Sequence, residues 1–470
     1  MTYPRRFPAH DLHRGTPLLT ALGLALGLAF AGCRSDGIEK PAEPSGGSSG
    51  SNAGSGGSSR GGNSGGSGGQ AGAPQAGAGG APGAGGESGE DAGAPSEAGP
   101  ATPPESSTPG TTDPSMFKYS KVIRLDTTGG GAGVSADVPG YPVAVQLDAT
   151  NFDFSQAQPA GQDVRFGTVD DKPLPYAIEL WDAAAQKAAL WVRVDLKGND
   201  STQSITLHWG NPQATSAADS KVVFSKEAGF LGVYHLDQDG NTTPGGYQDA
   251  SWNEVNGTGI LLSPGSAVPA RVGLGTRFVN PQGGAAGKIQ WIEVTGEKVL
   301  QDFGTRTHPI SVSVWAYAET WDGYYQTIIS KGDGSYSLQE DYQNRTEVCM
   351  SPTSGRYHQC AITGAPPTKR WMHYMIMRKN GPYASNNLVL YINGQRAAGT
   401  TAGGGHVDLP FGIANQSLRG RERDKKGFNG VLDEVRVMPV ERDANWAKLD
   451  YESQREGSTF LKFGETTTKP

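Results

Sequence analysis

The chain has little cysteine, no long apolar run and no concentration of positive charge. Three of its 470 residues are cysteine, and no second cysteine pair or suitably spaced histidine pair is present, which argues against a zinc site. The apolar stretch at residues 17–31 is shorter than the roughly 20 residues that a membrane-spanning helix needs, and no later segment is long enough. The net charge is −7 and no Lys/Arg run stands out, so nucleic acid is not an expected partner.

What is present at the start is an export signal. Several arginines precede the apolar stretch, which is the arrangement of a secretory signal peptide over residues 1–32. The stretch ends in "FAGC", which resembles a bacterial lipobox. That resemblance implies that Cys33 is acylated and anchors the protein in a membrane. By resemblance to lipoprotein sorting, an Arg rather than an Asp at position 34 favours the outer membrane. The protein would then face either the periplasm or the outside of the cell. The alternative is an ordinary signal peptidase site beside a chance cysteine.

Residues 33–115 consist largely of Gly, Ser, Ala and Pro. Such a composition cannot bury enough apolar surface to offset the entropy of ordering, so we expect a disordered tether. About 350 residues remain after the signal peptide and the tether, which suggests two domains. The folded part is then expected to work away from the membrane surface.

Residues 116–222 have the pattern of short β-strands. Apolar residues alternate in "YPVAVQLDA", "ALWVRVDLK" and "QSITLHWGN", and Gly, Asp and Pro clusters separate these runs. Alternation with period two predicts strands with one buried and one solvated face, and the spacing predicts an antiparallel β-sandwich.

The series "GQDVRFGTVDDKPLPYAIELWD" and "LWVRVDLKGNDSTQSITLHWGNP" resembles the domain-of-unknown-function family DUF2341. The family is a bacterial extracytoplasmic module that often precedes laminin-G-like domains, and it implies no firm activity. Asp163 and Glu179 could form an acid/base pair, but a turn carboxylate and a carboxylate on a wet strand face are the expected roles.

Residues 223–466 contain many strand patterns and one helix pattern. Asn393-Gly394 predicts a two-residue hairpin turn, and "ERDANWAKLDYESQ" predicts a short helix with Asp443 as its N-cap. In "GVLDEVRVM", Val431, Val435 and Val437 are expected on one strand face, with Leu432, Glu434, Arg436 and Met438 on the other. Many strands without alternating helices predict a two-sheet jelly roll.

The order of "GVYHLDQDG", "ISVSVWAY", "RWMHYMIMRKNG", "LVLYINGQ" and "FNGVLDEVRVM" resembles the laminin-G-like, concanavalin A-like jelly roll of bacterial surface proteins. The family often holds a structural calcium between an early loop and a late strand, and the matching carboxylates are Asp249 and Asp433. Two side chains need help from carbonyls and water to complete a calcium shell. Plain turn-capping and strand roles are the alternative.

Two further features concern stability and ligand contact. Cys349 and Cys360 flank "SPTSG" between strand-like segments, which predicts a disulfide across a hairpin in an oxidising compartment. Trp321, Tyr324 and Tyr325 in "WDGYYQT" could stack on sugar rings from a loop. Packing of this loop onto its own core is the alternative.

Catalysis is not expected. The jelly-roll family includes retaining glycoside hydrolases, which need two carboxyl groups about 5 Å apart. Here Asp433 and Glu434 are adjacent, so a regular strand sends them to opposite faces. Beyond residue 116 there is no Gly-x-Ser-x-Gly, His-Glu-x-x-His or phosphate-loop motif.

These features predict an all-β protein with two sandwich domains, presented from the cell envelope by a lipid anchor and a tether. The expected function is non-catalytic binding of a polysaccharide or a glycosylated surface partner. Protein–protein adhesion or a structural envelope role is the first alternative. An enzyme acting on envelope polysaccharide is the second.

Overall fold

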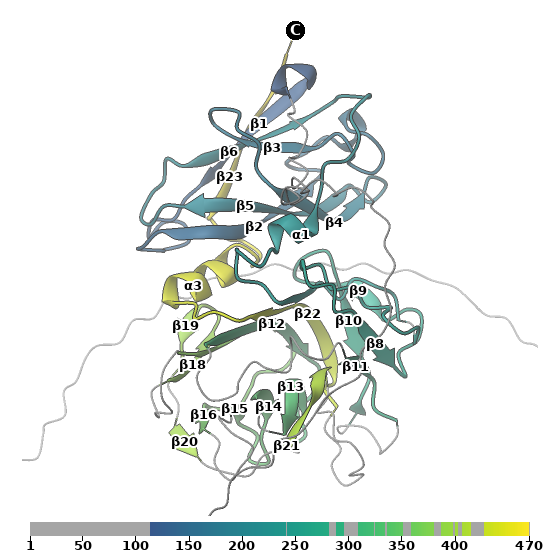
Figure 1. Ribbon diagram of the computed structural model, residues 1–470, viewed down its shortest axis with the longest axis vertical. Helices are drawn as coiled ribbons and strands as arrows, with labels where there is room; N and C mark the ends of the chain where they lie inside the picture. Colours follow the sequence, from purple (N-terminus) through teal and green to yellow (C-terminus); the bar gives the residue numbers. More distant parts are fainter. Residues whose placement is uncertain are drawn as a thin grey trace, which may run out of the picture. The chain divides into compact units, whose positions relative to one another are not determined.

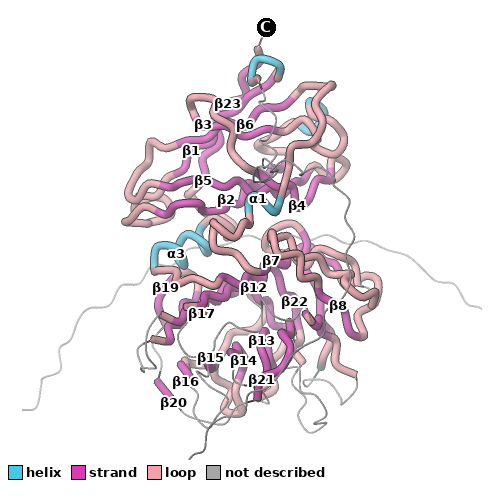
Figure 2. The backbone as a smooth tube through the Cα atoms, viewed as in Figure 1, coloured by secondary structure: helices cyan, strands magenta, loops and turns pink. Residues whose placement is uncertain are grey.

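The computed structural model describes residues 113–469 apart from 241, 282–287, 296–308, 324, 334–335, 351–358, 380–386, 398–399, 403–406 and 415–426. The described part is mostly β-strand and loop, as predicted (Figure 2). It belongs to a single compact unit. The predicted signal peptide, Cys33 and the predicted tether up to residue 112 lie outside the described residues. The end of the predicted tether overlaps a short helix, Pro114–Met116.

The first sandwich consists of two antiparallel sheets with the strand orders β23-β1-β6-β3 and β2-β5-β4 (Figure 1). Its strands are β1 (Tyr119–Leu125), β2 (Val138–Asp148), β3 (Arg165–Thr168), β4 (Tyr176–Asp182), β5 (Lys187–Leu196), β6 (Ser204–Trp209) and β23 (Leu461–Thr468). Short helices lie before β1 at Pro114–Met116, between β2 and β3 at Phe154–Gln156, and after β6 at Ser220–Val223 (α1). Ile123 and Leu207 from one sheet meet Val143 and Leu190 from the other in one apolar core.

The second sandwich is larger, and within the residues that the structure describes it has two eight-stranded sheets. One sheet has the order β19-β18-β17-β12-β22-β10-β9, with β7 also paired to β22, and the other has the order β20-β16-β15-β14-β13-β21-β11-β8. The first of these contains β7 (Gly232–Tyr234), β9 (Ala267–Pro269), β10 (Leu274–Phe278), β12 (Ile310–Ala318), β17 (Trp371–Arg378), β18 (Leu388–Ile392), β19 (Gln395–Arg396) and β22 (Gly430–Met438). The other contains β8 (Gly257–Ile260), β11 (Trp291–Val294), β13 (Thr327–Asp333), β14 (Tyr336–Glu340), β15 (Thr346–Met350), β16 (Gln359–Ile362), β20 (Thr400–Ala402) and β21 (Val407–Ile413).

Local sequence signals correctly located two connections of the second sandwich. Strands β18 and β19 are joined by Asn393 and Gly394, with φ values of 51° and 72°, as a two-residue hairpin turn requires. Helix α3 (Ala444–Glu452) begins where predicted, because the Asp443 carboxylate accepts a hydrogen bond from the Trp446 amide. Both predictions depend on a few neighbouring residues and are confirmed.

The last strand has a partner that the sequence analysis did not foresee. We expected residues 223–466 to form one domain, but β23 pairs along β1, with Thr468 opposite Tyr119 and Leu461 opposite Leu125. The chain therefore returns after α3 and adds an edge strand to the first sandwich. A strand pattern predicts a strand but not its partner, which is why the expected boundary differs from the observed pairing.

The two sandwiches are also joined by side-chain contacts. Tyr141 of β2 donates to or accepts from the Ser453 hydroxyl at 2.8 Å, and its ring meets that of Trp446 edge to face at 5.0 Å. The Arg436 guanidinium of β22 lies 4.3 Å from the ring centroid of Trp191 in β5. These contacts bury the outer face of β22, so that every residue of this strand is buried.

Candidate functional site

The predicted aromatic loop of the second sandwich is only partly available for ligand contact. Trp321 is half-buried against the core, where its indole N–H donates to the Pro367 carbonyl at 3.1 Å and its ring lies 5.5 Å from that of Phe428. This matches the alternative in which the loop packs onto its own core. Tyr324 lies outside the described residues. Tyr325 is half-buried and holds a φ of 58°, which is uncommon for a bulky residue.

Tyr342 completes an aromatic pair with Tyr325, and the sequence analysis missed it. Their ring centroids are 5.8 Å apart, and 59% of Tyr342 is exposed. Tyr342 lies in the turn between β14 and β15, so it comes from a different connection than Tyr325. An aromatic residue inside the turn sequence "EDYQNR" was the available signal. We call Tyr325 and Tyr342 the aromatic corner.

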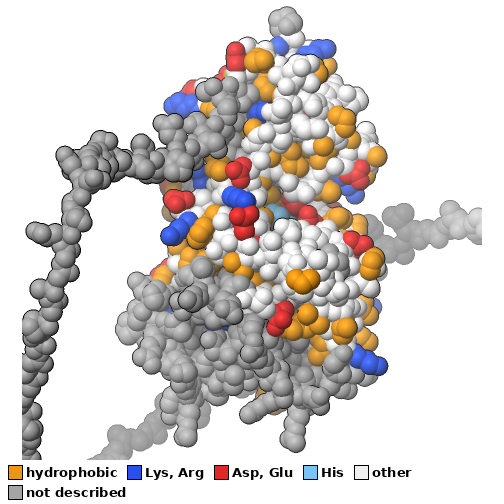
Figure 3. All heavy atoms as spheres, turned by 45° about the vertical axis from the view of Figure 1, so that its right-hand side comes forward, with side chains coloured by type: hydrophobic (Ala, Val, Ile, Leu, Met, Phe, Trp, Pro, Cys, Tyr) orange, Lys and Arg blue, Asp and Glu red, His pale blue; other side chains and the backbone are white. Residues whose placement is uncertain are grey.

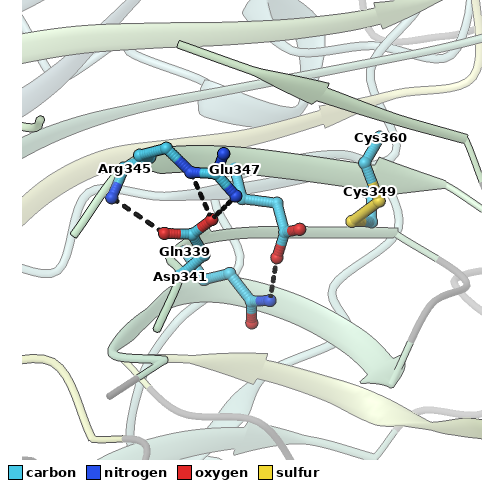
Figure 4. Close-up of a disulfide and its surroundings, with 6 residues drawn as sticks. All are labelled: Gln339, Asp341, Arg345, Glu347, Cys349 and Cys360. Carbon is cyan, nitrogen blue, oxygen red and sulfur yellow. Dashed lines mark hydrogen bonds and ion pairs between the residues drawn. A yellow bond between two sulfur atoms is a disulfide. The ribbon is translucent and has the colours of Figure 1, made fainter. Parts of the chain in front are cut away.

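The turn that carries Tyr342 is held by one carboxylate. Oδ1 of Asp341 accepts hydrogen bonds from the Gln343 and Arg345 amides, both at 2.9 Å. Its Oδ2 accepts from the Arg345 guanidinium, with Nε at 2.7 Å (Figure 4). Behind it, the Glu340 carboxylate accepts from the Gly323 amide at 2.7 Å and ties the two loops together. The exposed ring therefore stands on a fixed turn, which lowers the entropy lost when it contacts a ligand.

A row of polar side chains continues from this turn along the sheet. Gln339 and Glu347 are directly opposite on β14 and β15, and the Gln339 amide donates to the Glu347 carboxylate at 2.7 Å (Figure 4). The apolar neighbours Leu338 and Val348 point the other way, into the core. Gln339 is buried and Glu347 is half-buried, so Glu347 is the polar group of this pair that a ligand could reach.

The predicted disulfide is present on the same sheet. Cys349 and Cys360 are directly opposite residues of β15 and β16, with 4.1 Å between their Cα atoms, and they form a disulfide (Figure 4). Together with Glu347 they form one of the groups whose atoms could hold a metal ion, but both sulfurs are committed to the disulfide.

The predicted calcium carboxylates do not form a common cluster in the described residues. Both oxygens of Asp249 accept backbone hydrogen bonds, from Val233, Ser251 and Val255. One oxygen of Asp433 accepts from the amides of Arg271 and Val272. Neither residue belongs to the groups of three or more potential ligands that the described chain contains. The geometry therefore matches the turn-capping alternative rather than a shared calcium site.

Asp433 and Glu434 lie on the same face of β22, contrary to the expectation. A β-bulge interrupts the pairing with β12, because Ser313 faces Arg436 whereas Trp315 faces Asp433, and Glu434 has a φ of 53°. Leu432 lies in the core together with Val435 and Val437, so the expected division of faces was wrong before the bulge and right for Val435 and Val437 after it. Both carboxylates are buried, with 0% and 1% of the residue exposed.

The bulge creates a buried charged cluster between the sandwiches. Glu434 Oε1 lies 2.5 Å from His235 Nδ1, and Glu434 Oε2 accepts from the Arg436 guanidinium at 2.7 Å. Glu179 of β4 completes the group at 3.4 Å from His235 and accepts from the Trp191 indole at 2.7 Å. Glu179 was expected on a wet strand face, but its side chain is fully buried here.

The charges in this cluster shift one another's ionisation. Burial raises the pKa of Glu179 to about 8, so this carboxyl is mostly protonated at neutral pH. Burial alone would lower the pKa of His235, but Glu434 and Glu179 outweigh it and raise that pKa to about 10. Burial alone would raise the pKa of Glu434. The positive charges of His235 and Arg436 outweigh this effect, so the pKa of Glu434 is lowered.

Glu179, His235 and Glu434 could also hold a metal ion, because one ligand atom of each lies within 4.8 Å of the others. The short contact between His235 and Glu434 shows that these two groups already satisfy each other. The ion pairs of His235 with Glu179 and Glu434, and of Arg436 with Glu434, lie where the two sandwiches meet, and we call this group the ion-pair lock. The other predicted carboxylate of the first sandwich, Asp163, caps a turn by accepting from the Gln158, Gly210 and Asn211 amides, as expected.

Two stretches of the chain match known protein families. Residues 160–253 match the domain of unknown function DUF2341, and residues 290–447 match the concanavalin A-like lectin/glucanases superfamily. The chain therefore carries a DUF2341 stretch followed by a concanavalin A-like jelly roll, in the predicted order. No curated protein matches the chain.

Several solved structures resemble part of the chain. The binding domain of Paraclostridial Mosquitocidal Protein 1 is 14% identical, with 47% of this chain and 52% of that chain covered and a TM-score of 0.32. A structure described in terms of cell entry of botulinum neurotoxin type C and two ganglioside molecules is 13% identical, with 48% and 52% covered and a TM-score of 0.34. Domain 4 of an extracellular arabinanase from Geobacillus stearothermophilus, in complex with arabinotriose, is 15% identical, with 48% and 98% covered and a TM-score of 0.29. The chain spans about half the length of the toxin structures, and likenesses this weak say nothing of what it binds.

The surface and the helices add two observations. On the face drawn in Figure 3, basic and acidic side chains of the described residues are interspersed with hydrophobic ones, and no broad basic area appears. Among the described residues, no helix is long and apolar enough to cross a membrane.

Proposed function

We propose that this chain is a non-catalytic binding protein of the cell envelope that recognises carbohydrate through the aromatic corner of its second sandwich. The exposed ring of Tyr342, fixed by the Asp341 turn next to Tyr325, is the observation that carries the proposal. Aromatic faces stack on the C–H faces of sugar rings, and the half-buried Glu347 supplies a carboxylate that can accept hydrogen bonds. The match to a superfamily of lectins and glucanases agrees with this assignment.

A binding role fits the second sandwich better than glycoside hydrolysis. The two adjacent carboxylates that could have served as a catalytic pair, Asp433 and Glu434, are buried between the sandwiches and are out of reach of a polymer. Asp433 also gives one oxygen to two backbone amides. Mixing the protein with envelope polysaccharides and measuring released reducing ends tests this point, and sustained release would contradict a non-catalytic role.

A glycan array tests the proposal directly. The full chain, with and without calcium, is compared with a Tyr342→Ala variant and with a Val279→Ala variant, which changes another exposed apolar residue of the second sandwich. We expect Tyr342→Ala to weaken binding at least about tenfold, because central aromatic contacts dominate such interfaces. Val279→Ala should bind normally. An array with no bound glycan, or one on which Tyr342→Ala binds like the wild type, would contradict the proposal.

We further propose that the chain is exported and anchored through Cys33. The disulfide between Cys349 and Cys360 agrees with an oxidising compartment. Mass spectrometry of the mature N-terminus provides the test. An acylated cysteine at position 33 is the expected result, and an unmodified chain that starts elsewhere would refute the anchor.

A further inference from the structure

The buried charged cluster between the sandwiches has the donor atoms of a metal site. Nδ1 of His235 and carboxylate oxygens of Glu179 and Glu434 lie within 4.8 Å of one another. Glu179 and His235 belong to residues 160–253, which match DUF2341, whereas Glu434 belongs to residues 290–447, which match the lectin/glucanase superfamily. An ion bound here would therefore connect the two matched stretches of the chain. The proposed glycan site uses none of these residues.

The spacing of these groups is close to the spacing of ligands around a tetrahedral ion. Nδ1 of His235 and Oε2 of Glu179 are 3.4 Å apart, which is longer than an ordinary hydrogen bond. Two ligands that are each about 2.0–2.2 Å from a tetrahedral zinc ion lie about 3.4 Å from each other. Oε1 of Glu434 is only 2.5 Å from His235, so this oxygen has to move by roughly 0.9 Å to admit an ion. A small rotation of one side chain is enough for that movement.

Two buried carboxylate oxygens beside the cluster have no hydrogen-bond partner among the described residues. They are Oε1 of Glu179 and Oδ1 of Asp433, and both side chains are buried. Both carboxylates reach the same turn, because the Val272 amide donates to Asp433 and a Cβ atom on Gly273 would collide with Oε1 of Glu179. A buried carboxylate oxygen without a partner is costly, and a cation between the carboxylates removes that cost.

The cluster has more acidic groups than basic groups. Four carboxyl groups interact electrostatically in it, those of Glu179, Asp237, Asp433 and Glu434. The basic groups are His235 and Arg436, and the charge of Arg436 is shared with Asp450. A divalent ion that displaces one proton from His235 Nδ1 and one from Glu179 leaves the total charge unchanged, because two positive charges replace two. The ion therefore adds no uncompensated charge to the interior.

Neighbouring side chains already hold the three groups in place. Oε2 of Glu434 accepts from the Arg436 guanidinium at 2.7 Å, which leaves Oε1 directed at His235. Oε2 of Glu179 accepts from the Trp191 indole at 2.7 Å, and the same indole stacks on the His235 ring at 5.8 Å between centroids. Metal ligands are commonly oriented by such outer partners. The imidazole nitrogen favours a transition metal over calcium or magnesium.

We propose that Glu179, His235 and Glu434 bind a zinc ion that clamps the first sandwich to the second. Asp433, on the same face of β22 as Glu434, adds negative charge beside the ion. The ion-pair lock is then the ion-free form of the same group, in which protons take the place of the metal. Because the three side chains are buried, the ion enters while the two sandwiches assemble.

Metal retention by the full chain tests the proposal. The chain is stripped with a chelator, refolded from urea with its disulfide intact in the presence of zinc, manganese, calcium or magnesium ions, and dialysed before the bound metal is measured. We expect zinc to be retained at one ion per chain and calcium and magnesium to be lost. X-ray absorption should show one imidazole and otherwise oxygen ligands, about 2.0–2.2 Å from the zinc. No retained zinc, a preference for calcium, or a sulfur ligand would overturn the assignment.

Two matched variants locate the ion. Glu179→Gln keeps an oxygen that can accept from Trp191 but loses the charge, and should weaken zinc binding at least about tenfold. His208→Gln changes another buried histidine, outside the cluster, and should bind zinc normally. Thermal unfolding in chelator checks that both variants are folded, and added zinc should raise the unfolding temperature of His208→Gln and the wild type but not of Glu179→Gln. Equal zinc binding by Glu179→Gln would place the ion elsewhere and overturn the proposal.

Discussion

The two faces of β22 are packed in opposite ways. The inner face places Leu432, Val435 and Val437 in the apolar core of the second sandwich. The outer face places Asp433, Glu434 and Arg436 against the first sandwich, where Arg436 pairs with Glu434 and, at 2.9 Å, with Asp450 of α3. Apolar burial is stabilising at any pH and tolerates approximate packing, whereas buried ion pairs stabilise only when every partner is in place. The comparison indicates that the core holds the sandwich together and that the charged face fixes which surface the first sandwich meets.

The largest expected effect comes from removing the central cation. Arg436→Ala leaves Glu434 and Asp450 buried without their shared partner, which should lower the free energy of unfolding by about 3–5 kcal/mol. Arg436→Lys keeps the charge but loses the planar fork, so we expect a smaller loss. Equilibrium denaturation in urea measures both. A loss below about 1 kcal/mol for Arg436→Ala would show that the charges reach water once the arginine is removed.

The inner face provides the matched comparison. Leu432→Ala leaves a cavity in a core where Leu432 is fully buried, and should lower the free energy of unfolding by about 2–4 kcal/mol. Because no titrating group is involved, this loss should be the same at pH 6 and at pH 9. A loss that changes with pH would mean that the two faces of β22 are not independent.

The stability of the wild type should fall as the pH rises from 7 to 10, by about 1–3 kcal/mol. The pKa of His235 is raised from 6.5 to about 10 in the folded protein. The stabilisation that its positive charge gives is therefore complete below pH 6.5 and is lost as the pH rises towards 10. The pKa of Glu179 is raised from 4.5 to about 8, so keeping this buried carboxyl in place costs more free energy as the pH rises from 4.5 to 8. This effect also lowers the stability with rising pH, but at lower pH than that of His235. Glu179→Gln, which mimics the protonated carboxyl, should flatten the decline between pH 7 and 8. Urea melts at a series of pH values measure this, and a constant or rising stability would contradict the ion-pair lock.

The smallest effect on stability is expected at the aromatic corner. Tyr342 is exposed, so Tyr342→Ala should change the free energy of unfolding by no more than about 0.5 kcal/mol. Its loss of glycan binding would then be a loss of contact rather than of structure. A destabilisation of more than about 1 kcal/mol would instead assign Tyr342 a packing role.

Local patterns in the sequence predicted local structure well. The turn at Asn393-Gly394 and the cap at Asp443 each depend on a few neighbouring residues, and the disulfide depends on two cysteines flanking a turn. The bulge at Glu434 could not be predicted in this way, because its register is fixed by β12, more than a hundred residues earlier. A regular alternation places Asp433 on the face opposite Glu434, whereas the extra residue of the bulge puts both carboxylates on the same face.

The candidate site was predicted in type but not in its residues. Trp321 has an aromatic side chain in a loop, yet its N–H found a carbonyl on the neighbouring connection, which no local pattern reveals. Tyr342 was missed because a turn rich in polar residues draws attention to its Asp and Asn rather than to the ring between them. Glu179 appeared solvated because the strand pattern does not show that a second sandwich covers it.

The pairing of β23 with β1 affects the order in which the chain folds. Lys462 meets Asp126 at 2.8 Å although the two residues are 336 positions apart. The second sandwich lies entirely between these strands, so it can form while the outer edge of β1 is still unpaired. Contacts this distant in sequence form late, and the outer edge of β1 stays unpaired until Leu461–Thr468 has been synthesised. The first sandwich, although it is made first, is therefore the last part to be completed.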